Sequence, residues 1–224
     1  MAREEGEELM SVLGHELRSP LTAIRGAATL LLMAHGDLAG EKVEELLRVI
    51  DEQAAAMANR VEDVLAASRL QAGTLRLFEE TVDLTDAVAD LLDGGVAKGR
   101  KLTTRLPAEG VEVVADRQRL DQVLRALVDN AIRYSPAGTP VELRASAAGG
   151  VARVEVRDRG PGVTGPDRER VFQRGLKLDP DGPGAGLGLY VAAGLVETMG
   201  GESGVSARQG GGSVFWFTLP VAGK

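Results

Sequence analysis

The sequence predicts an α+β protein in which an N-terminal antiparallel helical hairpin, able to form a dimeric four-helix bundle, precedes an α/β sandwich. Two observations support this fold class. Apolar residues between 43 and 68 repeat at alternating spacings of four and three, which is the heptad pattern of packed helices. From about residue 81, short strand patterns alternate with helical ones. We therefore expect the hairpin at 1–72, a linker at 73–80 and the sandwich at 81–224.

The predicted hairpin contains two apolar stripes joined by a breaker-rich turn at 35–40. A single hairpin leaves part of both stripes exposed, so a dimer is the natural closure. The periodicity by itself fits a simple coiled-coil dimerisation element equally well. The first stripe consists of Leu9, Leu13, Leu17, Leu21, Ile24, Ala28 and Leu31, and the second of Val43, Leu47, Ile50, Ala54, Met57, Val61, Val64 and Ser68.

The second half is expected to place its helices on one face of a mixed sheet. Asp116 is well placed to cap a helix that extends to Tyr134, and Gly200-Gly201 would end the last helix. The other expected helices cover 84–92 and 189–199, and the expected strands cover 111–114, 141–145, 151–156 and 214–219.

Composition excludes several classes of function. The 224 residues carry 26 Lys+Arg against 33 Asp+Glu, a net charge of −7, and only 3% aromatic residues, so we expect no nucleic-acid partner. The absence of cysteine excludes disulfides, zinc–thiolate sites and thiol catalysis. No apolar run approaches the roughly 20 residues of a membrane span, and the N-terminus does not resemble a signal peptide. We expect a cytoplasmic protein, either complete or the cytosolic part of a longer one.

Two glycine clusters indicate where a ligand could bind. The segment 158–162 follows a predicted strand, and the segment 184–189 opens a predicted helix. Glycine lets the backbone approach a ligand closely, and a helix N-terminus offers free N–H groups to phosphate. Each cluster is a weak signal by itself, and neither the dinucleotide fingerprint nor the P-loop spacing is present.

The helix after Asp116 adds a third set of polar groups. Ala126, Asn130 and Arg133 share one helical face, because they are spaced by four and three residues. The Asn130 amide oxygen is a hard ligand suited to Mg²⁺, and the Arg133 guanidinium suits phosphate oxygens. The same pattern also describes an ordinary solvated helix face.

Five motifs in this order and spacing resemble the two-component sensor histidine kinases. Segment 15–22 resembles the H box, 127–135 the N box and 171–174 the F box, while 158–162 and 184–189 resemble the first and second glycine boxes. The resemblance covers essentially the whole chain. It implies a hairpin for dimerisation and histidine phosphotransfer, followed by a catalytic ATP-binding domain of the Bergerat, or GHKL, type.

The resemblance also implies roles for individual residues. His15 would be the phosphoacceptor, Glu16 its general base, Asn130 the ligand of Mg²⁺ and Asp158 the reader of adenine. Phe172 would anchor an ATP lid running from about 163 to 183. The remaining implied nucleotide contacts are Arg133 and Tyr134, the base-pocket walls Gly160 and Gly162, and Gly184, Gly186, Leu187 and Gly188 at the lid hinge and phosphates.

The implied activity is transfer of the ATP γ-phosphoryl group to His15 and then to an Asp in the receiver domain of a response regulator. The active species would be a homodimer formed through residues 1–72.

Three positions depart from the family pattern: Ala126, Gly175 and Ser19. Ala126 disfavours the rival class of hydrolytic Bergerat ATPases, which place a Glu there, because Ala cannot activate water. A second rival, a pseudokinase that only dimerises and binds nucleotide, is disfavoured by the presence of His15 and Asn130.

We predict weak phosphatase activity toward the phosphorylated regulator, dependent on Ser19. In resembling kinases the residue four positions after the histidine places the attacking water, and Ser19 lies one helical turn after His15 on the same face. The alternative is a surface serine that bonds to its own backbone. Ser19→Ala should lose the phosphatase activity and Ser19→Thr, with a stiffer side chain, should improve it, while autophosphorylation stays unchanged. The decay of phosphorylated regulator measures this effect, and equal rates in all three proteins would contradict it.

Overall fold

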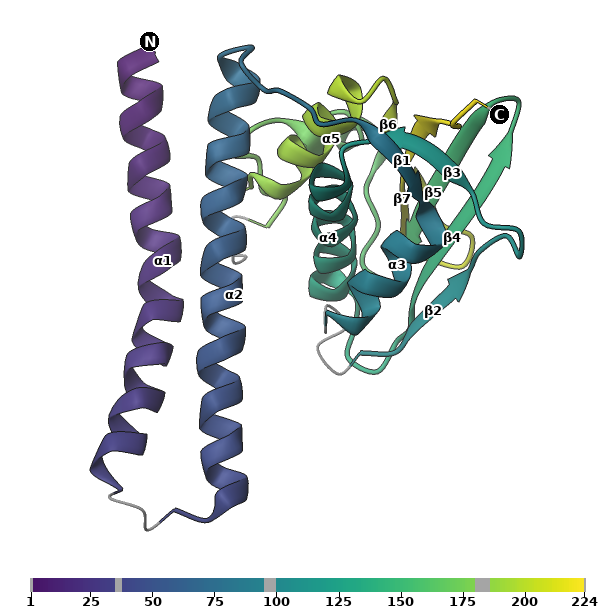
Figure 1. Cartoon of the computed structure of the whole chain (residues 1–224). Helices are drawn as coiled ribbons and strands as arrows, with labels where there is room; N and C mark the ends of the chain where they lie inside the picture. The colour runs from purple at the N-terminus through teal and green to yellow at the C-terminus, as the bar shows by residue number, and fades with distance from the viewer. Residues whose placement is uncertain (1, 35–37, 95–99, 180–185, 224) are drawn as a thin grey trace.

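The computed structural model describes residues 2–34, 38–94, 100–179 and 186–223, and the side chains of the first helix from Leu17 onward. The described elements form three layers (Figure 1). The helical hairpin is the first layer, a central group of helices is the second, and a five-stranded sheet is the third. The predicted fold class is confirmed, because a helical N-terminal region precedes a mixed α/β domain.

The hairpin consists of α1 (Ala2–Met33) and α2 (Gly40–Gln71), which run antiparallel (Figure 1). Both are 32 residues long. His15, Glu16 and Ser19 all lie within α1, as the resemblance implied. The side chains of His15 and Glu16, and residues 35–37 of the predicted turn, lie outside the described part of the chain.

The main sheet has the strand order β2-β4-β5-β7-β6. β2 and β4 are parallel, and all the other neighbours are antiparallel, so the sheet is mixed as predicted. In β5, alternate residues are buried, as expected for a sheet that packs helices on one face. The strands are β2 (Leu102–Arg105), β4 (Val141–Ala148), β5 (Val151–Arg157), β6 (Ser203–Ala207) and β7 (Ser213–Pro220).

A separate two-stranded ribbon continues the linker. β1 (Glu80–Asp83) pairs antiparallel with β3 (Glu112–Ala115), and α3 (Leu84–Asp93) follows β1 directly. The side chain of Asp83 caps α3 by accepting from the Thr85 N–H at 2.6 Å. The sequence predicted β3 and α3 but not β1, β2 or β6. β1 and β2 have only four residues each, and β6 is composed mostly of Gly, Ser and Ala, so their pairing partners rather than their propensities make them strands.

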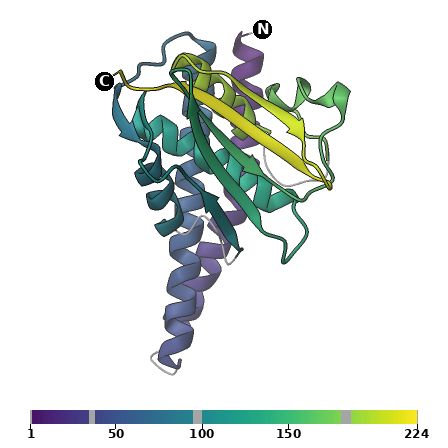
Figure 2. The ribbon, with the colours of Figure 1, turned by 90° about the vertical axis from the view of Figure 1, so that its right-hand side faces the viewer.

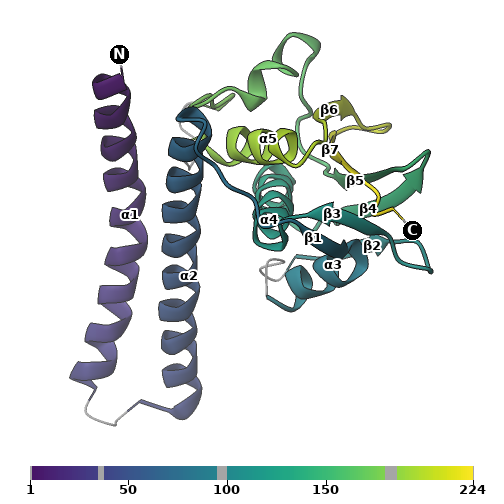
Figure 3. The same cartoon turned by 45° about the horizontal axis from the view of Figure 1, so that its top comes forward.

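The second layer consists mainly of α4 (Arg117–Tyr134) and α5 (Gly188–Thr198), which lie between the hairpin and the sheet (Figures 1 and 3). Their apolar faces are buried against the sheet, whose opposite face carries no described helix, as the side view shows (Figure 2). The buried apolar residues of these two helices are Leu120, Val123, Leu124, Leu127, Val128 and Ala131 in α4, and Val191, Ala192, Leu195 and Val196 in α5.

The hairpin and the sandwich touch through α2. Leu70 of α2 packs so closely on Gly194 of α5 that a Cβ at Gly194 would lie 2.7 Å from the Leu70 Cδ1. At the end of α2, the Arg174 guanidinium donates to the Gln71 side chain at 3.1 Å. Within the described residues, no helix is long and apolar enough to cross a membrane.

Asp116 connects the linker to α4, and we expect its removal to destabilise the sandwich. One carboxylate oxygen accepts from the Arg119 N–H at 3.1 Å and the other from the Phe78 N–H at 2.9 Å, and the residue is 5% exposed. Asp116→Ala removes a helix cap and a second, partly buried hydrogen bond, so the free energy of unfolding should fall by about 2 kcal/mol. Fluorescence of the single tryptophan, Trp216 in β7, during denaturant unfolding measures the loss. The exposed Glu79→Ala serves as control, and equal midpoints would contradict the capping role.

Candidate functional site

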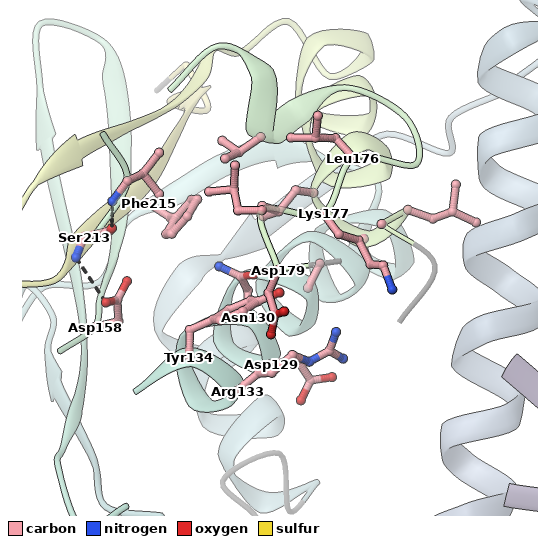
Figure 4. A pocket seen from close by; sticks show the side chains of 18 of the residues that line it. Asp129, Asn130, Arg133, Tyr134, Asp158, Leu176, Lys177, Asp179, Ser213 and Phe215 are labelled. Atoms are coloured by element: carbon pink, nitrogen blue, oxygen red, sulfur yellow. Dashed lines mark hydrogen bonds between the residues drawn. The ribbon is translucent and has the colours of Figure 1, made fainter. Parts of the chain in front are cut away.

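A cavity of about 520 Å³ lies where α4, α5, the carboxyl end of β5 and the start of β7 meet α2 of the hairpin (Figure 4). Residues from the N box and from both glycine boxes line it together. The segments are far apart in sequence, so their convergence is a property of the fold. The sequence-predicted residues that line the cavity are Asn130, Arg133, Tyr134, Asp158, Gly162, Gly186, Leu187 and Gly188.

The other predicted residues lie elsewhere. Gly160 and Phe172 are next to the cavity rather than in its lining. Ser19 lies exposed on α1. Gly184 is outside the described residues.

Asp158 follows β5 and forms one end of the cavity (Figure 4). It is 3% exposed. Its Oδ1 accepts from the Gly160 N–H at 2.7 Å and from the Ser213 N–H at 3.1 Å, and its own N–H donates to the Ser213 carbonyl at 3.0 Å. Two backbone N–H groups therefore fix the carboxylate before a ligand arrives, and the third bond fixes the backbone of Asp158. Among the described residues no donor reaches Oδ2, so this oxygen can accept from a ligand amine.

The buried environment of Asp158 disfavours the ionised form of its carboxyl group. Burial raises the pKa of its carboxyl above the ordinary value, and the Gly160 and Ser213 N–H groups together with Arg208 only partly offset this effect. The ionised carboxylate, which can accept hydrogen bonds on both oxygens, is therefore protonated at a higher pH than an exposed aspartate would be.

The first glycine box positions this carboxylate. A Cβ at Gly160 would lie 2.8 Å from the carbonyl oxygen of Tyr134, so only glycine allows the loop to pass the end of α4. Gly162 has a φ of +81° and lines the cavity itself. Gly160 thus holds the Asp158 carboxylate through its N–H, whereas Gly162 forms part of the cavity wall.

The second glycine box forms the opposite side of the cavity. Gly186 has a φ of +68°, and a Cβ there would lie 2.8 Å from the Gly175 backbone. The Gly175 N–H donates to the Gly186 carbonyl at 3.1 Å. Gly175, which departs from the family pattern, therefore packs against the glycine box and leaves room for it.

Helix α5 begins at this box and points its N-terminus at the cavity. Leu187 is the N-cap and makes no side-chain cap bond, and Gly188 is the first helical residue. Both line the cavity. The uncapped N–H groups of the first turn are suited to phosphate oxygens.

The polar face of α4 completes the site. Ala126, Asp129, Asn130 and Arg133 all line the cavity, so this face of α4 forms part of its wall. The described residues contain no cluster of three or more His, Cys, Asp or Glu side chains that could hold a metal. A Mg²⁺ ion held by one amide oxygen, water and ligand phosphates needs no such cluster, so Asn130 fits this kind of site.

Phe172 connects the segment after β5 to the sheet. Its ring meets that of Phe215 edge to face, with centroids 6.4 Å apart and planes at 74°. Phe215 itself lines the cavity. At the start of the same segment, the Val163 N–H donates to the Ser213 hydroxyl at 3.1 Å. β7 therefore anchors this segment at two points.

Sequence reasoning missed several residues of the cavity. Ser213 and Phe215 begin β7, immediately after three glycines, and this break was the only local signal of their importance. Lys177 and Asp179 come from the segment before the second glycine box, and Arg60 and Asp63 come from α2. Val64, also from α2, lines the cavity too, and nothing in the spacing of the hairpin residues indicated that these three face it.

Comparisons with known proteins agree with this site. The family described as "Histidine kinase-, DNA gyrase B-, and HSP90-like ATPase" matches residues 115–223, and the "His Kinase A (phospho-acceptor) domain" matches residues 7–73. The sensory/regulatory protein RpfC of Xanthomonas campestris is 33% identical over 99% of this chain and 32% of its own length. The adaptive-response sensory kinase SasA of Synechocystis is 31% identical over 96% of this chain and 59% of its own length.

Solved structures give the same result. Full-length ShkA in complex with AMPPNP is 32% identical, with a TM-score of 0.67 over 97% of this chain and 46% of that one. The Acinetobacter baumannii histidine kinase AdeS is 27% identical, with a TM-score of 0.63 over 93% of this chain and 98% of that one. The chain spans about a third of the length of the first curated relatives that it matches.

We expect Asp158→Asn to lose selectivity for adenine over guanine. Asn can still accept from the backbone N–H groups, but its NH₂ would face the ligand amine as a second donor. The ratio of affinities for AMPPNP and GMPPNP, measured by calorimetry, should fall about tenfold. Acidification should lower AMPPNP affinity more in the wild type than in the variant, because the variant has no carboxyl at position 158 to protonate. The exposed Asp51→Asn on α2 is the control, and an unchanged ratio in Asp158→Asn would exclude the base-reading role.

Proposed function

Since the chain belongs to the two-component sensor histidine kinase family, we propose that it phosphorylates itself on His15 from ATP and passes the phosphoryl group to an Asp of a response regulator. The observation that carries this proposal is the convergence of the N box and both glycine boxes on one cavity. The phosphoacceptor motif stands on the helical hairpin of the same chain.

The cavity supports one orientation of the nucleotide. Adenine binds at the Asp158 end, where Oδ2 accepts from its exocyclic amine. The phosphates then extend toward Asn130, Arg133 and the N-terminus of α5. This orientation places phosphate charge against a guanidinium and free N–H groups, where it is stabilised.

Asn130 would hold Mg²⁺ through its amide oxygen, with the phosphates and water as the other ligands. A bound ion would supply positive charge to offset that of the phosphates. Arg133 adds a second positive charge from the next turn of α4. The catalytic half positions the nucleotide and neutralises charge, since phosphoryl transfer requires little covalent chemistry from the protein.

His15 is the nucleophile. One imidazole nitrogen attacks the γ-phosphorus, a P–N bond forms, the bond from phosphorus to the bridging oxygen breaks, and ADP leaves. Glu16 accepts a hydrogen bond from the N–H of the other nitrogen, so the attacking nitrogen carries the lone pair. Glu16 takes this proton as the P–N bond forms, which leaves the phosphorylated ring neutral. In the second step an Asp carboxylate of the regulator attacks the same phosphorus and releases His15. Because this chemistry consumes ATP, we assign it to the cytoplasm.

We also propose that the active species is a homodimer formed through the hairpin. Both helices carry large apolar side chains that the single chain leaves open. Leu21 of α1 and Leu47 of α2 are each 52% exposed, and Leu65 is 41% exposed. A second copy would cover these residues and close a four-helix bundle.

A hydrolytic ATPase of the same fold is the main rival. The position from which such enzymes activate water is Ala126, which lines the cavity and has no base. Label transferred from ATP therefore distinguishes the classes. The label ends on the protein for a kinase and in free phosphate for a hydrolase. For a pseudokinase it stays on ATP.

His15→Gln should abolish autophosphorylation and leave nucleotide binding and dimerisation intact, because His15 lies on the hairpin and the nucleotide cavity is built mainly from the sandwich. The measurement is incorporation of γ-labelled ATP into protein, with the label lost in acid and stable in base. The chain has two histidines, so His35→Gln is a matched control that should retain full labelling. Acid-labile phosphate on His15→Gln would show that the site assignment is wrong.

A further inference from the structure

One wall of the nucleotide cavity belongs to the hairpin rather than to the sandwich. Arg60, Asp63 and Val64 of α2 line the cavity together with the glycine boxes and the polar face of α4. Val64 is buried, at 8% exposed. The cavity therefore spans the boundary between the two parts of the chain, and its ligand has both as neighbours.

The hairpin wall lies opposite Asp158. In Figure 4, Asp158 and Ser213 are at one end of the cavity, and the hairpin helix is beyond the other end. The charged groups of Arg133 and Lys177 point toward that helix (Figure 4). A nucleotide with its adenine at Asp158 thus extends its phosphates toward α2.

A buried polar network holds α2 in this position. The Gln122 Nε2 of α4 donates to the Asp63 Oδ1 at 2.8 Å, and the Gln122 Oε1 accepts from the Arg119 guanidinium at 3.0 Å. Arg119 also forms an ion pair with Glu62 of α2 at 3.6 Å. Gln122 and Arg119 are only 8% and 7% exposed. Buried polar groups that satisfy one another in this way fix the relative position of two helices.

Arg60 lies one turn before Asp63 on the same face of α2. Burial raises the pKa of the Asp63 carboxyl, and the hydrogen bond from Gln122, followed by the positive charges of Arg125 and Arg60, partly counters this increase. Arg60 and Asp63 both belong to the cavity wall. A guanidinium has five N–H donors, so it can keep a contact within the wall and still bind a phosphate.

We propose that Arg60 binds the terminal phosphate of ATP, so that the hairpin itself supplies part of the nucleotide site. The inference rests on the proposed function in taking ATP as the ligand. A planar guanidinium can bind two phosphate oxygens at once. With adenine at Asp158, we expect a triphosphate to contact Arg60 and adenosine monophosphate not to contact it.

A shared site couples nucleotide binding to the position of α2. If ATP contacts both parts of the chain, its binding favours their docked arrangement. Docking then raises ATP affinity by the same factor as ATP favours docking, so weaker docking lowers ATP affinity. Gln122 does not line the main cavity, so it influences ATP only by holding α2 through Asp63. This separation of roles allows a test.

The first measurement is calorimetric titration of the whole chain with AMPPNP and with AMP at constant Mg²⁺. Arg60→Gln should weaken AMPPNP about tenfold, the order expected for a charge-assisted bond, and leave AMP unchanged. Arg48→Gln, an exposed arginine earlier on α2, is the control and should change neither. Equal losses for both nucleotides, or no loss for AMPPNP, would overturn the role of Arg60.

The second measurement combines Arg60→Gln with Gln122→Ala. Gln122→Ala alone should weaken AMPPNP, but it should cause no further loss in the Arg60→Gln background, because the contact that depends on docking is already absent. Gln122→Glu, which repels Asp63 without opening a cavity, should behave alike. Fully additive losses would overturn the coupling through Arg60. A wild-type chain that binds no adenine nucleotide would overturn the proposed function itself, and this inference with it.

Discussion

The whole structure depends on the burial of α4 between two surfaces. Its apolar residues face the sheet, and Gln122 and Arg119 face the hairpin. This leaves Ala126, Asn130 and Arg133 facing the cavity. A helix that packs on one side only could rotate or shift, whereas α4 is held from both sides and capped by the buried Asp116. The groups that would meet the metal and phosphates are thereby fixed by packing rather than by a loop.

The cavity forms because glycine allows the backbone to pass closely at two points. Gly160 lies against the carbonyl of Tyr134, which brings the Asp158 loop to the end of α4. Gly186 lies against Gly175, which brings the segment after β5 to the start of α5. Together these two contacts bring both glycine boxes to the cavity. The position of Gly175, which departs from the family pattern, is therefore consistent with a formed site rather than with a damaged one.

Local patterns predicted the elements whose periodicity is strong. The heptad spacing of the hairpin and the capped apolar pattern of α4 both led to helices in the expected places. β1, β2 and β6 were missed because they are short or poor in strand-forming residues. These strands exist because neighbours such as β7 offer hydrogen-bonding partners, and no window of sequence contains that information.

The sequence by itself determined the family, the two-part organisation and the residues of the five boxes, because each box is a local pattern whose spacing can be read directly. Only the tertiary structure decided which of these residues share a cavity and what else joins them. Ser213 holds Asp158 from a strand 55 residues away, and Arg60 and Asp63 enter the cavity wall from a helix of the other part of the chain. Such neighbours are made by packing between distant segments. Local sequence patterns contain no information about such contacts, so only the fold shows that the cavity extends to the hairpin.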